Sequence, residues 1–319
     1  MLRDLPGARV VAVAPGAADE AVSRFDSAAG VTAQTARYAS YRDLLAAGDL
    51  DAVQVCVKPM RTATVLAECL RAGIPAMADK PLAATEAQLA EVWAAHKETG
   101  TDFSATHMFR KMRSFALAHE LVRSGQAGEI VAGHCQISFR WGASRPDWFR
   151  TRETFPGTFA FIGVHAVDTA FWTVGDTFRS VTGYESTAPH PDYPACASLA
   201  YAMVVLDNGG ALVLSADFLR PMGASTHGDV RLRLAGTKMT LDASDRDETA
   251  LAVVDGARDV AMDAPEIPFW YTTWAQHVLG QGAPFMTTRE ACRITELTLR
   301  IQRAIDSGDT QDLRGSITD

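Results

Sequence analysis

The sequence predicts an α/β fold in two parts: a parallel-sheet domain over residues 1–108, then an α+β domain with a largely antiparallel open sheet over residues 109–319. Three observations predict it. Short apolar runs alternate with amphipathic helical stretches through the first hundred residues, a pattern typical of parallel strands joined by crossover helices. Later segments alternate apolar and polar residues between turn signals. The length of 319 residues, at about 150 residues per domain, also indicates two domains.

The strands expected in the first domain are apolar runs, and the helices between them have apolar residues at helical spacing. We expect strands at residues 9–14, 51–57, 74–78 and 102–106, and helices at residues 41–47, 62–72 and 85–98. Gly73 and Gly100 stand just past two of these helices, where a left-handed cap favours glycine. The run at 51–57 is apolar enough to be buried on both faces, as strands of a parallel sheet are.

The second domain combines helices with alternating strands. We expect helices at residues 114–124, 161–172 and 288–306, and strands at residues 130–141, 200–206, 211–216, 231–235 and 251–254. The turn sequence Asp-Asn-Gly-Gly at 207–210 lies between two of these strands and predicts a hairpin. An open sheet leaves one face without helices, and Leu206, Leu212 and Leu214 belong to its strands. We therefore expect a homodimer or homotetramer formed through this sheet.

Composition and charge exclude several classes of protein. Apolar residues make up 47% and charged residues 21%, which is ordinary globular usage. The net charge of 30 − 38 = −8 gives no attraction to nucleic acid or to an anionic membrane surface. The five cysteines are scattered and form no C-x-x-C pair, so we expect neither disulfides nor a metal site. A cytoplasmic protein with a small-molecule substrate is the remaining expectation.

A lysine at the end of a predicted strand is the first candidate for chemistry. Asp79-Lys80-Pro81 follows the strand at 74–78, at the carboxyl edge where open parallel sheets bind ligands. Burial lowers the pKa of a lysine, so Lys80 is a candidate proton donor or acceptor, and Pro81 can fix its backbone by a cis or rigid bond. An ordinary solvated lysine in a loop is the alternative.

A histidine on a predicted helix is the second candidate. Phe161, His165, Asp168 and Trp172 share one face by their i, i+3 and i, i+4 spacing. His165 is suited to proton transfer or to a hydrogen bond with substrate, with Asp168 to orient it. A buried histidine satisfied by that carboxylate is the alternative, and no second histidine stands at metal-ligand spacing.

Aromatic and cationic residues gather just before that helix, at Arg140-Trp141, Arg145, Trp148-Phe149-Arg150 and Arg152. Guanidinium groups bind carboxylate or phosphate, and tryptophan stacks on sugar rings, so this segment is suited to a small anionic or polyol substrate. A solvated loop with aromatic anchors is the alternative.

Taken together, these motifs resemble the Gfo/Idh/MocA family of NAD(P)-dependent oxidoreductases. Residues 5–13 and 41–53 resemble the family's second strand and the helix and strand that follow, and residues 121–130 resemble the entry to its second domain. Asp79-Lys80-Pro81 resembles the Glu-Lys-Pro signature, whose lysine serves catalysis, and residues 163–168 resemble the helix with the catalytic histidine. The resemblance implies a Rossmann-like first domain, with the parallel sheet incomplete at its beginning, and the cofactor NAD or NADP.

The chain departs from the family pattern at several positions. It contains no G-x-G-x-x-G turn, and Pro15-Gly16 stands where the family has an acidic residue for the ribose. Phe161 takes the place of a frequent catalytic Asp, and no histidine follows the strand at 51–57. Two explanations compete: Met1 is not the natural start, or the chain has lost cofactor binding.

The resemblance implies a reaction and a set of site residues. We expect an NAD(P)-dependent oxidoreductase acting on a sugar-like or cyclitol hydroxyl or ketone, with Lys80 and His165 in proton transfer. Pro59, Asp79 and Lys80 are then expected to contact the cofactor, and the expected substrate contacts are Arg110, Trp148, Arg150 and Asp168. The alternatives are a cofactor-independent acid–base enzyme (elimination, epimerisation or cyclisation) on the same scaffold and a non-catalytic partner subunit.

Overall fold

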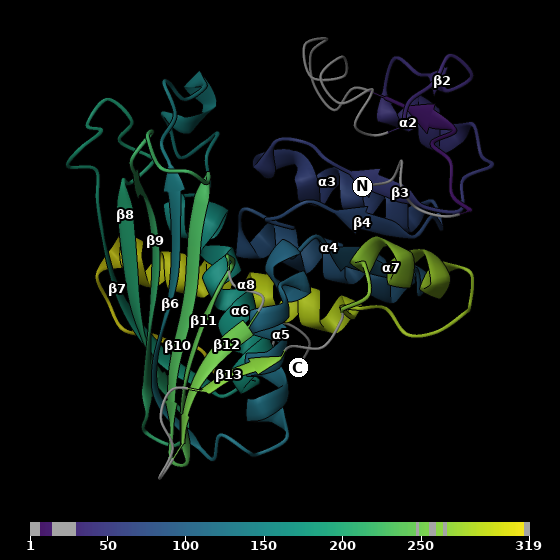
Figure 1. Cartoon of the computed structure of the whole chain (residues 1–319). Helices are drawn as coiled ribbons and strands as arrows, with labels where there is room; N and C mark the ends of the chain where they lie inside the picture. Colours follow the sequence, from purple (N-terminus) through teal and green to yellow (C-terminus); the bar gives the residue numbers. More distant parts are fainter. Residues whose placement is uncertain (1–6, 15–29, 247–248, 255–259, 264–266, 316–319) are drawn as a thin grey trace. The chain divides into compact units, whose positions relative to one another are not determined.

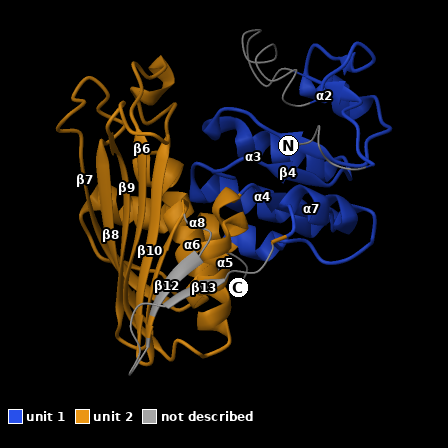
Figure 2. Ribbon diagram, viewed as in Figure 1, with its two compact units in different colours: residues 1–106, 268–292 blue, residues 107–267, 293–319 orange. Residues whose placement is uncertain are grey.

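The computed structural model describes residues 7–14, 30–246, 249–254, 260–263 and 267–315, and these form two compact units. Unit 1 comprises Met1–Thr106 and Pro268–Cys292, and unit 2 comprises His107–Ile267 and Arg293–Asp319 (Figure 2). The chain first passes between the units at 106/107, two residues before the expected boundary. Met1, Pro15 and Gly16, on which two of the expectations depend, lie outside the described residues.

Unit 1 is built on a three-stranded parallel sheet with the order β3-β4-β5 (Figure 1). A separate parallel pair, β1-β2, precedes it in the chain. The strands are β1 (Ala12–Val13), β2 (Ala36–Arg37), β3 (Val53–Val55), β4 (Ala76–Ala78) and β5 (Phe103–Ala105), and the helices are α2 (Tyr41–Ala46), α3 (Pro59–Arg71), α4 (Glu86–Thr99) and α7 (Trp270–Val278). Each predicted strand and helix of this part of the chain is present within a few residues of its expected bounds.

Local sequence explains where these helices begin and end. The Thr85 side chain accepts the backbone N–H of Gln88 and so caps the start of α4. Gly100 ends that helix in the left-handed conformation, with φ of 68°, as its position predicts. Proline at the first position of α3 has the φ of a helix and lacks an N–H that would have no partner there.

A later segment returns to unit 1, which corrects the expectation that all residues after 108 belong to the second domain. Trp270 and Trp274 of α7 are buried against Met77 of β4. Phe269, Tyr271 and Val278 pack around them, and Phe285 does so as well. Burial of these large apolar side chains, about 25 cal/mol per Å² of apolar surface, holds the segment to the first sheet.

Unit 2 contains a nine-stranded sheet with the order β13-β12-β11-β10-β6-β9-β8-β7-β14. The strands are β6 (Ile130–Arg140), β7 (Phe178–Ser186), β8 (Leu199–Leu206), β9 (Ala211–Arg220), β10 (Gly228–Gly236), β11 (Met239–Ser244), β12 (Thr249–Val254), β13 (Val260–Asp263) and β14 (Gln311–Asp312). Every neighbouring pair is antiparallel except β6 and β9. The predicted hairpin joins β8 to β9.

Helices cover one face of this sheet (Figure 1). They are α5 (Arg113–Arg123), α6 (Val164–Val174) and α8 (Thr288–Ser307), with short helices η2 (Met108–Lys111) and η3 (Asp147–Phe149) and a π-helix, η4 (Phe159–Gly163). Leu206, Leu212 and Leu214 are buried, so they do not form the surface that we expected to meet a partner. Among the described residues, no helix combines the length and apolar character needed to cross a bilayer.

Candidate active site

Lys80 lies in unit 1, directly beyond the buried strand β4. The backbone N–H of Asp79 donates to the carbonyl of Val55 at 2.8 Å, which extends the β3–β4 pairing by one residue. The backbone N–H of Lys80 donates to Oδ1 of Asp79 at 2.9 Å. The Lys80–Pro81 peptide bond is cis, and Pro81 and Leu82 are buried. The lysine is thus fixed at the carboxyl edge of the sheet, where the sequence places it.

The environment of Lys80 favours its neutral form. Burial lowers the pKa of its ammonium group to about 8, and the charge of Asp79 only partly opposes this effect. Asp79 itself is exposed. Pro59, the third expected cofactor residue, is buried at the first position of α3.

Tyr271 is a polar group at this edge that the sequence did not indicate. Burial raises the pKa of its phenol to about 12; the Cys56 thiol and the Asp79 carboxylate add to the effect, and a hydrogen bond with Thr106 partly opposes it. The phenol therefore stays protonated and can donate a hydrogen bond close to Asp79. No local signal marks Tyr271, because it comes from α7, far along the chain from β3 and β4.

His165 lies in unit 2, at the start of α6, and its side chain is buried. Its ring meets the edges or faces of three others, with centroids at 5.0 Å for Phe109, 6.2 Å for His107 and 6.4 Å for Phe139. Phe139 comes from β6, so the histidine belongs to the face of the sheet that carries the helices.

Asp168 forms an ion pair with Arg110, and both side chains are only 1% exposed. Nε of Arg110 donates to Oδ1 of Asp168 at 2.9 Å, and Nδ1 of His107 lies 3.6 Å from Oδ2. Asp168 thus contacts the neighbours of His165, and burial favours a positioning role over substrate contact for both members of the pair. His107 was not predicted, although its place two residues after β5 follows the strand-end rule that indicated Lys80.

The helix containing Phe161 is not a regular α-helix along its whole length. Residues Phe159–Gly163 form a π-helix, whose wide turn changes the angle between side chains on either side of it. The ring of Phe161 packs against Phe149 and Phe155, with centroids at 5.5 and 5.3 Å. Where the family often has a proton-transferring Asp, this chain has an aromatic cluster.

The remaining expected substrate residues have partners within unit 2. Trp148 joins the Phe161 cluster, with its ring centroid 5.8 Å from that of Phe161. Arg150 is exposed and lies 3.1 Å from Asp147 and 4.3 Å from the centre of the Tyr193 ring. Within the described parts of the chain, no group of three His, Cys, Asp or Glu residues is arranged to hold a metal ion.

Comparison with known proteins places both units in one family. Residues 3–107 match the family model described as "Oxidoreductase family, NAD-binding Rossmann fold", and residues 115–242 match the model described as "GFO/IDH/MocA C-terminal domain".

Individual relatives agree with this family. An inositol 2-dehydrogenase of Burkholderia multivorans is 30% identical over 185 residues, which are 56% of this chain and 51% of the relative; the chain thus spans about half the length of that protein. Inositol 2-dehydrogenase 1 of Saccharopolyspora erythraea is 29% identical over 81% of this chain and 72% of its own length. A solved oxidoreductase structure from Thermotoga maritima superposes with a TM-score of 0.87 at 26% identity, covering 95% of this chain and 92% of that one. The chain belongs to the Gfo/Idh/MocA family of oxidoreductases.

Proposed function

We propose that this protein is an NAD-dependent dehydrogenase of a sugar-like or cyclitol hydroxyl group, in which Lys80 and His165 handle the protons. The observation that carries the proposal is Lys80 itself, fixed at the carboxyl edge of the first sheet with a pKa lowered to about 8. The NAD-binding family model supports the cofactor, and the two relatives named inositol 2-dehydrogenase support the substrate class.

The lowered pKa gives Lys80 a function near neutral pH. At pH 7.5 an amine of pKa 8 is about 24% neutral, whereas one of pKa 10.5 is about 0.1% neutral. The neutral amine accepts the hydroxyl proton as the alcohol becomes a ketone, and the ammonium returns it in the reverse reaction. When bound, NAD⁺ supplies the acceptor for the hydride that leaves the carbinol carbon.

Residues at the sheet edge fit the nicotinamide half of the cofactor. Pro59 opens α3 at this edge, and the backbone N–H groups of its first turn favour a polar or anionic group. Asp79 and Lys80 flank the same edge, and the protonated phenol of Tyr271 adds a donor. The chain contains no G-x-G-x-x-G sequence for the pyrophosphate, so affinity for the whole dinucleotide is the quantity to measure.

The role proposed for His165 follows from its surroundings. Phe161 carries no proton, so the family's usual acid at that position is replaced by a side chain without acid–base chemistry. His165 can carry a proton, and its ring centroid lies 6.4 Å from that of Phe139. We assign it the hydrogen bond to the reacting oxygen, with His107 and Asp168 behind it to fix its position.

Calorimetric titration with NAD⁺, NADH, NADP⁺ and NADPH, followed by oxidation of myo-inositol and a panel of hexoses, tests the proposal. We expect micromolar binding of NAD⁺ and a 10²- to 10⁴-fold loss of kcat in Lys80→Met, as is usual for a removed general base. Lys97→Met is the matched control, because Lys97 is exposed on α4. In wild type, kcat should rise with pH around pH 8 as Lys80 loses its proton. The residual kcat of Lys80→Met should lack this rise.

The same measurements separate this proposal from its competitors. The dehydrogenase proposal is wrong if neither the folded protein nor a form extended upstream in the gene binds any of the four dinucleotides. A cofactor-independent acid–base enzyme is then the function to test. If dinucleotide binds but Lys80→Met turns over substrate within a few-fold of wild type, the proton role of Lys80 is wrong.

A further inference from the structure

Arg145 occupies a fixed position in unit 2 between β6 and η3. Its guanidinium carbon lies 4.4 Å from the centre of the Phe218 ring and 5.2 Å from that of Trp141. The Phe149 ring is also at 5.2 Å, and Nη2 donates to the carbonyl of Arg140 at 3.0 Å. Three rings and one hydrogen bond therefore hold the cation in one place.

No carboxylate of the described residues neutralises this cation. Its Nε is buried with no hydrogen-bond partner, whereas the buried Arg110 is paired with Asp168 and Arg293 with Asp176. Burial lowers the pKa of Arg145, and the two neighbours that partly oppose this effect, Cys196 and Tyr193, are not carboxylates. The site is thus short of one negative charge.

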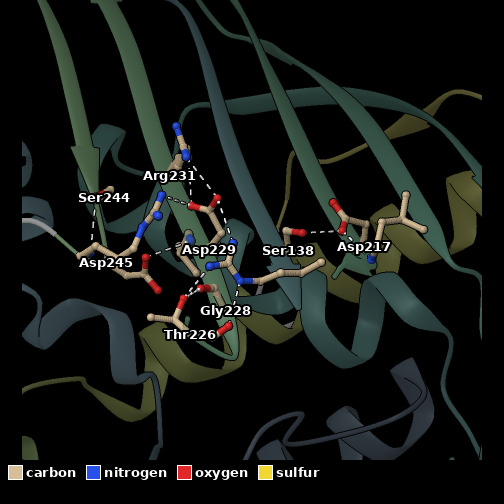
Figure 3. Close-up of polar contacts among 12 residues, drawn as sticks. Ser138, Asp217, Thr226, Gly228, Asp229, Arg231, Ser244 and Asp245 are labelled. Atoms are coloured by element: carbon tan, nitrogen blue, oxygen red, sulfur yellow. Dashed lines mark hydrogen bonds and ion pairs between the residues drawn. The ribbon is translucent and has the colours of Figure 1, made fainter. Parts of the chain in front are cut away.

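The carboxylates at this end of the sheet are engaged elsewhere. Figure 3 shows Asp229 bonded to Arg231, at 2.9 Å, and Asp217 accepting from Ser138, at 2.6 Å. Arg220 and Arg246 also lie within 3.3 and 2.9 Å of Asp229. Within the described part of the chain, neither acid forms an ion pair with Arg145, although Asp217 is adjacent in sequence to Phe218, whose ring contacts this cation.

Arg145 lies on the same face of the sheet as His165. Ile137 of β6 pairs with Ala216 of β9, and Phe139 and Phe218 each lie two residues further along these parallel strands, so their side chains share a face. Phe139 contacts His165, and Phe218 lies under Arg145. His227 stacks on Phe139 with ring centroids 5.2 Å apart. Burial lowers the pKa of His227, and the charges of Arg145 and Arg140 lower it further. The Phe139 ring therefore lies between His165 and His227, and the charge of Arg145 acts on His227.

We propose that Arg145, assisted by His227, binds a carboxylate of the substrate, so that the hydroxyl oxidised beside His165 belongs to a sugar acid rather than to a neutral polyol. The inference rests on the proposed dehydrogenase function and narrows its substrate class. One uncompensated guanidinium matches the single charge of a carboxylate, and a planar fork of N–H donors is suited to its two oxygens. The neutral His227 ring supplies a further N–H.

Calorimetry with matched acid and neutral ligands tests this inference. In the presence of NAD⁺, D-glucuronate is compared with D-glucose and D-gluconate with D-glucitol, because the members of each pair differ in the carboxylate. We expect at least one acid to bind 10- to 100-fold more tightly than its neutral partner, the usual effect of a charge-assisted hydrogen bond. Arg145→Met should abolish that preference.

Controls keep the outcome independent of folding and of the dehydrogenase proposal. Arg314→Met removes the same charge from an exposed pair with Asp312 and should keep the acid preference. Arg145→Lys retains the charge without the planar guanidinium and should keep part of the preference for the acid. It provides a second test if Arg145→Met folds poorly. The inference is overturned if no acid is preferred or if the preference survives in Arg145→Met. NAD⁺ affinity, titrated separately, reports on the dehydrogenase function whichever result is found.

Discussion

Burial acts on single residues of the two units in opposite ways. At Lys80 the charge of Asp79 does not cancel the loss of hydration, so folding shifts the equilibrium from the ammonium toward the neutral amine. At Arg110 the buried guanidinium lies 2.8 Å from the buried carboxylate of Asp168, so here burial is accompanied by an ion pair. The first arrangement favours proton transfer and costs stability, and the second holds neighbouring groups in place.

Replacing Lys80 should therefore stabilise the folded protein. Its folded pKa of about 8 lies below the ordinary value of 10.5, so the penalty is complete below pH 8 and disappears as the pH rises through 10.5. We expect Lys80→Met to increase the free energy of unfolding at pH 7 by at most about 3 kcal/mol, and so to raise Tm. The rise in Tm should be smaller at pH 10. Thermal melts at both pH values check this. Equal shifts at pH 7 and 10 would mean that the gain comes from packing and not from the charge.

Breaking the buried pair should be far more costly than removing an exposed one. Asp168→Asn leaves Arg110 charged and buried, so we expect a loss of about 3–5 kcal/mol in free energy of unfolding. The double variant Arg110→Met/Asp168→Leu should recover most of it, because no isolated charge remains. Urea denaturation measures both, with Arg314→Met, expected to change stability by less than about 1 kcal/mol, as the control. A loss from Asp168→Asn as small as that of the control would show that the pair contributes no more than a surface ion pair.

At the scale of elements, the sequence predicted what depends on neighbours along the chain. Short apolar runs and helical spacing located β3, β4, β5 and their helices, because each pattern reflects which side chains are buried. Lys80 was found because a strand end fixes its place. Tyr271 and the return of residues 268–292 to unit 1 depend on packing against Met77 and have no local signature. The π-helix at 159–163 was not predicted, because the helical spacing of apolar residues does not distinguish a π-turn from a regular α-helix.

At the scale of the whole molecule, the helix-free face of the second sheet needs a partner. Tyr184 pairs with Tyr201 across β7 and β8, and Met203 pairs with Val213 across β8 and β9. These four side chains are 65%, 44%, 50% and 37% exposed, and none carries a charge. An isologous contact places such a patch against itself and needs no partner of opposite charge, so we propose a second copy of this chain as the occupant.

A charge in the middle of this patch should separate the copies. Met203→Glu alters an outward side chain of β8, so the fold should persist while two carboxylates face each other across the contact. We expect light scattering at micromolar concentration to give a dimer or tetramer for wild type and a smaller species for Met203→Glu, with unchanged circular dichroism. Leu279→Glu, at a residue 60% exposed in unit 1, is the matched control and should assemble as wild type does. A monomeric wild type would refute the contact, and assembly that survives Met203→Glu would place it on another surface.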